Sequence, residues 1–196
     1  FIALGEMMNY PGAIGRDPEV VSKVDAARKM AKPVDGHAPS VTGAPLKEYV
    51  GLGISTDHEC SSHEEAMEKH ALGMQIMVRQ GSASKNLVSL IPFVKQNDFI
   101  LVSDDKNVSD LMAGHLDRSL SLAVASGVDP VHALRAATIN PATHYNLPLG
   151  SIEPGKAADV VRVRDLRNFE VQEVYIGGEL VAANGVAKFE VKPKEM

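Results

Sequence analysis

Short apolar segments recur along the first half of the chain, and each one stops at a polar residue. Their ends lie 31, 21, 22 and 24 residues apart, at Glu6, His37, His58, Gln80 and Asp104. Helix-patterned segments lie between them, and one strand with its helix in a parallel (β/α)₈ barrel takes about 25–31 residues. The spacing therefore predicts an α/β fold built on part of such a barrel.

Local signals predict where individual elements begin and end. Asp17 and Pro18 predict the start of a helix, and Ser62 with Glu65 three residues later is typical of a capped helix. Pro92 should shorten or kink the helical pattern of residues 86–95. Strands are expected over residues 1–4, 33–34, 52–55, 74–78 and 99–102, and helices over 46–50 and within 110–137.

The character of the chain changes after Leu147. Residues 151–163 combine a Pro-Gly turn with a β-rich segment, and residues 171–185 resemble two strands joined at Gly177-Gly178. We therefore expect two domains, a partial barrel over residues 1–147 and a small β domain over residues 148–196.

Charge and composition exclude several classes of protein. The formal net charge is −5 and the basic residues are scattered, which argues against partners such as nucleic acid or an anionic membrane. No apolar run is long enough to cross a bilayer. Cys60 is the single cysteine, which fits a reducing compartment, so a cytoplasmic location is expected. Because the chain begins within a strand-like run, we expect it to be a fragment.

Four of the polar strand ends carry groups that bind metals. A single histidine or acid after a strand is usually an ordinary hydrogen-bonded residue. Here, however, two imidazoles and two carboxylates follow strands whose C-terminal ends should lie together, namely Glu6, His37, His58 and Asp104. A mixed nitrogen and oxygen set suits Zn²⁺, Mn²⁺ or Fe²⁺. A carboxylate bridging two cations about 3.5–4 Å apart would activate water, which predicts hydrolysis.

Three further residues are weaker candidates. Arg79 and Ser82 flank the turn after the fourth strand and could present hydrogen-bond donors to a substrate. His115 could orient a group at the same end of the barrel, although a surface position on a helix explains it as well. All three are predicted here as substrate-binding residues.

Several motifs occur together in the order found in one known family. They are GEMMNYPG (5–12), DGHAP (35–39), TDHE (56–59), GSASKNL (81–87), VSDD (102–105), GHLD (114–117), ATINPA (137–142) and PGKAADVV (154–161). PGKAADVV is typical of a whole superfamily, whereas the first three are far more specific. Together they resemble the adenine deaminases of the amidohydrolase superfamily, across nearly the whole chain.

The resemblance implies a fold, a reaction and a cofactor. The fold would be strands 4 to 8 of a TIM-like (β/α)₈ barrel followed by part of a small β-sandwich. The reaction would be hydrolysis of the small-molecule substrate adenine to hypoxanthine and ammonia in purine salvage. The cofactor would be a binuclear centre of divalent metal, Mn²⁺ or Fe²⁺, with Zn²⁺ as an alternative. The resemblance also implies a homo-oligomer.

Residue roles follow from the same resemblance. Glu6 resembles the bridging carboxylate, His37 and His58 resemble metal ligands, and Asp104 resembles the acid that ends the last barrel strand. Position alone suggests Glu59 or Asp105 as a proton shuttle beside Asp104. Protonation is required because ammonia leaves readily only when the exocyclic nitrogen carries a proton.

The chain departs from the family pattern in three respects. Glycine is usual where Ser40 stands, and glutamate where Gln80 stands. The His-x-His pair at the end of the first barrel strand has no counterpart, and neither has most of strands 1 to 4. Because a partial barrel leaves unpaired strand edges, we expect the remainder to come from further sequence or from another chain.

Two alternatives stay open. One is an amidohydrolase acting on a cyclic amide, similar to dihydroorotase or hydantoinase, because substrate choice depends on loops rather than on the shared metal scaffold. Those enzymes commonly bridge their metals with a modified lysine, so Glu6 argues against them. The other is a non-catalytic remnant that keeps the fold as an interaction module.

Overall fold

The computed structural model describes residues 1–190, and its first half alternates strands with helices. In chain order these elements are β1 (Leu4–Met7), α1 (Tyr10–Ile14), α2 (Pro18–Lys29), β2 (Val34–Gly36), α3 (Gly43–Gly51), β3 (Thr56–Asp57), α4 (His63–Ala71), β4 (Gln75–Arg79), α5 (Ile91–Val94) and β5 (Ile100–Val102). Four helices follow, namely α6 (Val108–Ala113), α7 (Leu116–Ala125), α8 (Pro130–Ala137) and α9 (Ile139–His144). The predicted α/β alternation is therefore confirmed.

The five strands pair in parallel and in chain order. β1 pairs with β2, and β3, β4 and β5 form a second parallel set. The amide of Ser55 donates to the carbonyl of Val34 at 2.9 Å, which links the two sets between β2 and β3. All five C-terminal ends therefore point to the same side of the molecule.

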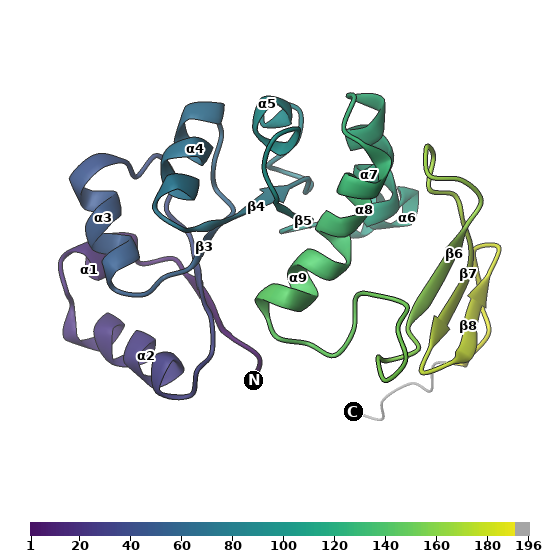
Figure 1. The fold of residues 1–196 in the computed structure, drawn as a ribbon, viewed down its shortest axis with the longest axis horizontal. Coiled ribbons are helices and arrows are strands. Elements are labelled where there is room, and N and C mark those ends of the chain that lie inside the picture. The colour runs from purple at the N-terminus through teal and green to yellow at the C-terminus, as the bar shows by residue number, and fades with distance from the viewer. Residues whose placement is uncertain (191–196) are drawn as a thin grey trace.

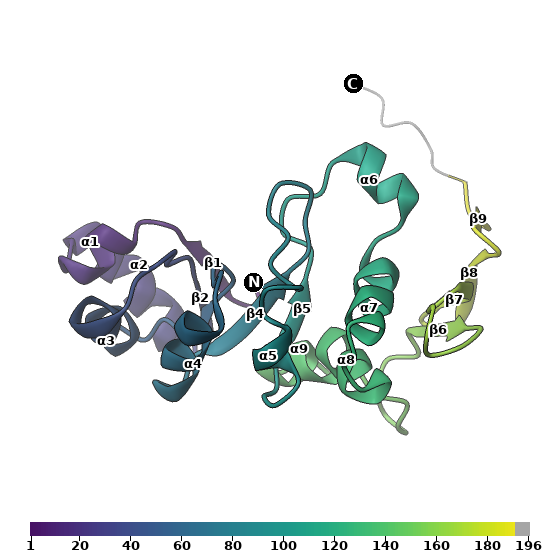
Figure 2. The ribbon, with the colours of Figure 1, turned by 90° about the horizontal axis from the view of Figure 1, so that it is seen from above.

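The parallel strands and their helices lie along an arc. Figure 1 shows the chain passing from α1 and α2 through β3, β4 and β5 to α7 and α8, with the small sheet at the far end. Figure 2, seen from above, shows the same progression and places α6 apart from the other helices.

The capping signals in the sequence are confirmed by the structure. The carboxylate of Asp17 accepts hydrogen bonds from the amides of Glu19 and Val20 at the start of α2. The hydroxyl of Ser62 accepts from the amide of Glu65 at 3.2 Å and caps α4. Each cap satisfies a helical N–H that would otherwise have no partner in the helix.

Several predicted boundaries were wrong. The strand expected at residues 52–55 is β3 at Thr56–Asp57, because the Leu52 amide continues the hydrogen bonding of α3 and Gly53 turns the chain at φ 105°. The strand expected from residue 1 begins only at Leu4. Pro92 lies in the first turn of α5, so the helix expected over residues 86–95 is limited to Ile91–Val94.

The C-terminal part of the described chain is a four-stranded antiparallel sheet. It contains β6 (Val160–Val163), β7 (Val171–Ile176), β8 (Glu179–Ala183) and β9 (Val186–Ala187), paired in that order. Gly177 and Gly178 join β7 to β8 with positive φ angles, as the sequence predicts. The predicted domain of residues 148–196 includes residues 191–196, which lie outside the described residues.

The buried core packs the strands against their covering helices. Val34, Ile76 and Val78 from the strands are fully buried, as are Leu46 of α3 and Phe93 of α5. This packing holds the strand ends in place. Within residues 1–190, no helix has the length and apolar character needed to cross a membrane.

Candidate metal centre

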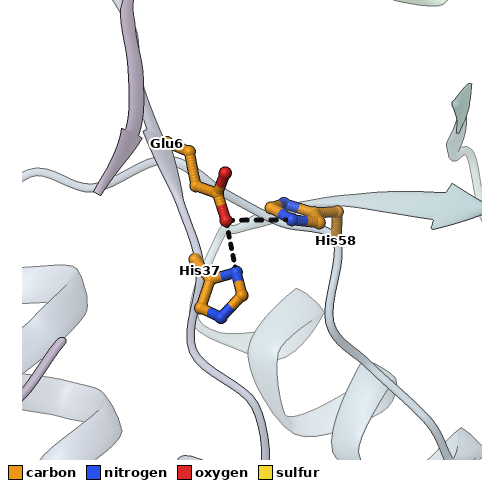
Figure 3. Close-up of side chains that lie close together, drawn as sticks. All are labelled: Glu6, His37 and His58. Carbon is orange, nitrogen blue, oxygen red and sulfur yellow. Dashed lines mark ion pairs between the residues drawn. The ribbon is translucent and has the colours of Figure 1, made fainter. Parts of the chain in front are cut away.

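Three neighbouring strands bring Glu6, His37 and His58 together. Glu6 lies in β1, and the two histidines directly follow β2 and β3. One carboxylate oxygen of Glu6 contacts His37 Nδ1 and lies 3.4 Å from His58 Nε2, as Figure 3 shows. The three ligand atoms all lie within 4.8 Å of one another, so they surround one point in space.

The contacts within this group fit a shared cation better than a hydrogen-bonded cluster. His37 Nδ1 is buried and, among the described residues, has no hydrogen-bond partner, although it touches the Glu6 carboxylate. Carboxylate oxygens of Glu6 and Glu59 lie against this nitrogen, an arrangement that a shared cation would hold. Two imidazole nitrogens and a carboxylate oxygen suit Zn²⁺, Mn²⁺ or Fe²⁺. The residues present therefore fit a divalent metal.

A second group of potential ligands shares His58. The ligand atoms of His58, Glu59 and Asp104 also lie within 4.8 Å of one another. Oε1 of Glu59 is 3.2 Å from His37 Nδ1 and 3.5 Å from His58 Nε2. Glu59 therefore borders both imidazoles, and the two groups of ligands are continuous.

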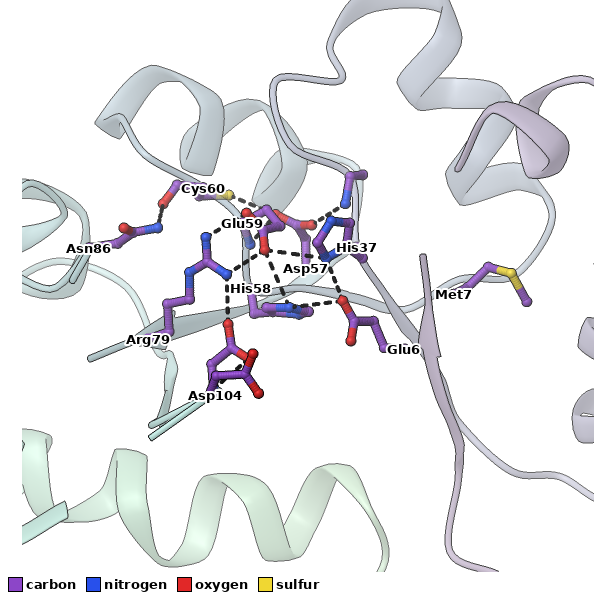
Figure 4. A network of polar contacts seen from close by, with 12 residues as sticks. Glu6, Met7, His37, Asp57, His58, Glu59, Cys60, Arg79, Asn86 and Asp104 are labelled. Atoms are coloured by element: carbon purple, nitrogen blue, oxygen red, sulfur yellow. Dashed lines mark hydrogen bonds and ion pairs between the residues drawn. The ribbon is translucent and has the colours of Figure 1, made fainter. Parts of the chain in front are cut away.

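Arg79 holds the two outer acids of the cluster. It ends β4, and its guanidinium donates to both oxygens of Glu59 and to Oδ2 of Asp104 at 2.6 Å (Figure 4). A planar guanidinium suits such paired contacts. Burial opposes ionisation of Asp104, but the hydrogen bonds from Arg79 and from the amide of Asp105, together with nearby positive charge, outweigh it and lower the pKa of Asp104. Both acids are thus oriented by one cation.

Asp104 has an unusual backbone conformation, which directs its carboxylate toward Arg79. Its φ is 55°, in the left-handed region that aspartate tolerates better than most residues. Oδ1 accepts a hydrogen bond from the following amide, that of Asp105, at 2.7 Å. Oδ2 remains directed at Arg79, so the turn after β5 presents the carboxylate to the cluster.

Two buried polar side chains that the sequence analysis did not assign to the site hold the ligand segments. Tyr49 Oη accepts from the amide of His37 at 2.9 Å and donates to the carbonyl of Met7 at 3.1 Å. Tyr49 therefore ties the residue after Glu6 to His37. Asp57, the residue before His58, is fully buried and accepts from the amide of Ala38 at 2.8 Å. In the sequence, Tyr49 has the spacing of a core residue, so its hydroxyl gave no functional signal.

Comparison with known proteins gives the family. The model of the amidohydrolase family matches residues 2–181. The chain belongs to the amidohydrolase family.

Relatives of this amidohydrolase chain are named as adenine deaminases. The adenine deaminase of Methanothermobacter thermautotrophicus is 53% identical over 184 residues, which cover 94% of this chain and 34% of that protein. The adenine deaminase of Methanosphaera stadtmanae is 46% identical over 194 residues, covering 99% of this chain and 35% of that protein. The chain spans about a third of the length of these curated relatives.

Solved structures share the amidohydrolase chain's fold at low sequence identity. A beta-aspartyl dipeptidase from Fervidobacterium islandicum AW-1 has a TM-score of 0.67 with 22% identity, covering 91% of this chain and 54% of that one. An enamidase of the amidohydrolase superfamily has a TM-score of 0.66 with 18% identity, covering 85% of this chain and 52% of that one. These likenesses concern the mixed α/β fold alone.

The amidohydrolase structure does not bring every candidate residue into the cluster. Within residues 1–190, the side chains of Asp105, Ser82 and His115 have no hydrogen bond or ion pair with the cluster. Ser82 Oγ instead accepts from the amide of Asn107 at 2.9 Å. Asp105 and His115 are exposed, and His115 immediately precedes α7. Their predicted roles in proton transfer and substrate binding stay predictions.

Proposed function

We propose that this amidohydrolase chain is part of an adenine deaminase, which hydrolyses adenine to hypoxanthine and ammonia. The observation that carries the proposal is the meeting of Glu6, His37 and His58 at one point, in a chain 53% identical to a named adenine deaminase. The similarity extends over 94% of this chain.

We assign metal ligation to the residues that surround the shared point. Glu6, His37 and His58 would hold one divalent cation, and Asp104 with His58 borders the position of a second. A cation held there supplies Lewis acidity and lowers the pKa of water toward neutrality. Mn²⁺ and Fe²⁺ are the proposed ions, with Zn²⁺ as the alternative that the same donor atoms accept.

The acids of the cluster are proposed to move protons. Departure of ammonia requires a proton on the exocyclic nitrogen, and a carboxylate close to the reacting carbon can deliver it. Glu59 and Asp104 suit this role because Arg79 holds both in one orientation. Asp105 is an alternative proton carrier because its side chain is exposed beside Asp104. Arg79 then acts by orienting these acids, while Ser82 and His115 would reach the purine.

The proposed fold places this chain in the C-terminal part of a larger enzyme. Residues 1–147 would supply strands 4 to 8 of a (β/α)₈ barrel, and residues 148–196 part of a β-sandwich. Within the described residues, β1 and β5 each pair on one edge only, which supports completion by further sequence or by another chain. A cytoplasmic location is proposed from the single cysteine, and a homo-oligomer from the family resemblance.

An assay of ammonia release tests the proposal. Purified protein loaded with Mn²⁺ or Fe²⁺ would be incubated with adenine, with dihydroorotate and with hydantoin, and its metal content would be measured. Ammonia and hypoxanthine formed from adenine alone are the expected result. Ring opening of a cyclic amide without turnover of adenine would assign the chain to the dihydroorotase-like alternative. A protein that binds no metal would be the non-catalytic remnant.

A further inference from the structure

A buried lysine lies behind the candidate metal centre. Lys69 of α4 has a fully buried side chain, and its ammonium donates to three acceptors. They are the carbonyl of Ala38 at 2.6 Å, Oδ2 of Asp57 at 3.0 Å and Oε1 of Glu65 at 2.7 Å. Three donors meeting three acceptors satisfy the ammonium completely, which is the condition for keeping a charge inside a protein.

The acceptors of Lys69 belong to the two chain segments that carry the histidine ligands. Ala38 directly follows His37, and Asp57 directly precedes His58. Asp57 strengthens the link, since Oδ1 accepts from the amide of Ala38 at 2.8 Å and Oδ2 from the amide of Glu59 at 3.0 Å. One ammonium and one carboxylate therefore join the ends of β2 and β3 where the imidazoles project.

Glu65 extends the same network to two more loop amides. Its Oε1 accepts from the amide of Ser40 at 2.9 Å, and its Oε2 accepts from the amide of Ser61 at 3.1 Å. Ser40 has a φ of 59°, and the family pattern favours glycine there because glycine adopts that conformation without strain. In this chain the hydrogen bond to Glu65 supports the same loop conformation.

The charges in this network are held in their ionised forms. Burial would lower the pKa of Lys69, but the charge of Asp57 and hydrogen bonds to Asp57 and Glu65 outweigh it and raise that pKa. Burial likewise opposes ionisation of Asp57, and Lys69 reverses it, so the pKa of Asp57 is lowered. The pair therefore acts as an internal salt bridge.

The network is not a second metal site. Ligand atoms of Asp57, Cys60 and Glu65 also lie within 4.8 Å of one another, but Lys69 already supplies the cation that bonds both acids. Burial raises the pKa of the Cys60 thiol, which donates to Asp57 Oδ2 at 3.3 Å instead of acting as a thiolate ligand. The internal ammonium takes the place of a metal ion.

We propose that Lys69 is a positioning residue for the metal centre. Its ammonium joins the segment after His37 to the segment before His58, and it thereby sets the separation of the two imidazoles. This inference rests on the metal site assigned in the proposed function. Residues that orient ligands in this way typically change metal affinity or activity by about 10- to 100-fold when they are replaced.

Metal binding by Lys69→Met tests the proposal. Protein stripped of metal would be titrated with Co²⁺ against a competing chelator, and visible absorption would report the coordination geometry. Lys69→Met should bind Co²⁺ about 10- to 100-fold more weakly than the wild type, with an altered absorption spectrum. The control is Lys47→Met, which replaces an exposed lysine of α3 and should leave both measurements unchanged.

Two further measurements distinguish a loss of folding from a loss of ligand positioning in the Lys69 variants. Circular dichroism at low temperature shows whether Lys69→Met folds, because removing one partner of a buried pair is strongly destabilising. If it does not fold, Lys69→Arg keeps the charge but changes the geometry of the donors, and its Co²⁺ spectrum should differ from that of the wild type.

Three results would overturn the inference. A folded variant with wild-type affinity and spectrum would show that Lys69 does not position the ligands. Failure of both variants to fold would assign Lys69 to stability alone. A wild-type protein that binds no Co²⁺ would refute the proposed metal site itself, and this result is distinguishable from the other two because it needs no variant.

Discussion

At the scale of single residues, the candidate centre depends on side chains that packing does not require. His58 lies at the end of a strand, and its Nε2 faces the carboxylates of Glu6 and Glu59. His132, in contrast, lies within 2.8 Å of the carbonyl of Val94 through its own Nε2 and joins α8 to the end of α5. His58 thus faces the candidate metal centre, whereas His132 serves to hold two helices together.

Replacement of His58 by alanine should remove metal without unfolding the protein. Loss of a ligand should lower metal affinity by more than about 100-fold, beyond the effect typical of residues that only orient ligands. Metal content and circular dichroism, measured on the same sample, check this. His132→Ala is the matched control and should lower the melting temperature while metal content stays normal. Wild-type metal content in His58→Ala would contradict the assigned ligand role.

Replacement of Arg79 by lysine should reduce activity more than metal content. Lysine keeps the positive charge but loses the planar set of donors that holds Glu59 and Asp104 together. We expect kcat for adenine to fall about 10- to 100-fold with the metal retained. Arg162→Lys, which alters an exposed pair with Glu173 in the small sheet, is the control and should have no effect. Unchanged kcat in Arg79→Lys would rule out the orienting role.

At the scale of elements, the site depends on where helices and strands begin and end. Helix α4 supplies Lys69 and Glu65 to the buried network, and its start is set by the cap at Ser62. Gly36 of β2 shows how closely these elements pack. A Cβ at this position would lie 2.3 Å from the carbonyl oxygen of Thr56, so only glycine allows β2 and β3 to approach this closely beside His37.

Removal of the cap on α4 should lower stability by about 1 kcal/mol. Ser62→Ala leaves the Glu65 amide without its partner, whereas Thr42→Ala is a matched control, because Thr42 precedes α3 without forming a side-chain cap. Urea unfolding should show a lower midpoint for Ser62→Ala and little change for Thr42→Ala. Equal midpoints for the two variants would mean that the cap contributes nothing measurable.

At the scale of the whole molecule, the proposed ligands come from parts of the chain that are distant in sequence. Glu6, His37 and His58 come from three strands, and Asp104 lies after a fifth. Cations bound by these residues would stabilise the arrangement of the strands, because ligands that bind only the folded state raise its stability.

Chelation of the metal should therefore lower the melting temperature. At a metal concentration 100 times the dissociation constant, the stabilisation is about 2.7 kcal/mol, which corresponds to roughly 5–10 °C for a domain of this size. Thermal melts with and without a chelator measure the difference. His58→Ala should show no such difference, and an equal shift in both proteins would indicate that the chelator acts elsewhere.

The sequence alone predicted the alternation of elements and the polar strand ends, because both are local properties. Apolar segments of strand length and capping residues act over a few positions, so Ser62, Asp17 and the turn at Gly177-Gly178 were identified correctly. Boundaries were predicted less well, since residues 52–55 were expected as a strand, whereas Leu52 caps the end of α3 and β3 begins only at Thr56. In that case helical hydrogen bonding outweighed strand propensity.

Only the tertiary structure decided which polar groups meet and what each one bonds. Glu59 and Arg79 are 20 residues apart, and Lys69 reaches Ala38 across 31 residues, so no local pattern could reveal either contact. Lysine is a residue type expected at the surface, and the charge of Lys69 is buried only because α4 packs against the ends of β2 and β3. The residue types in the sequence determined which chemical groups the site contains. Their positions relative to one another were decided only when distant segments of the chain folded together.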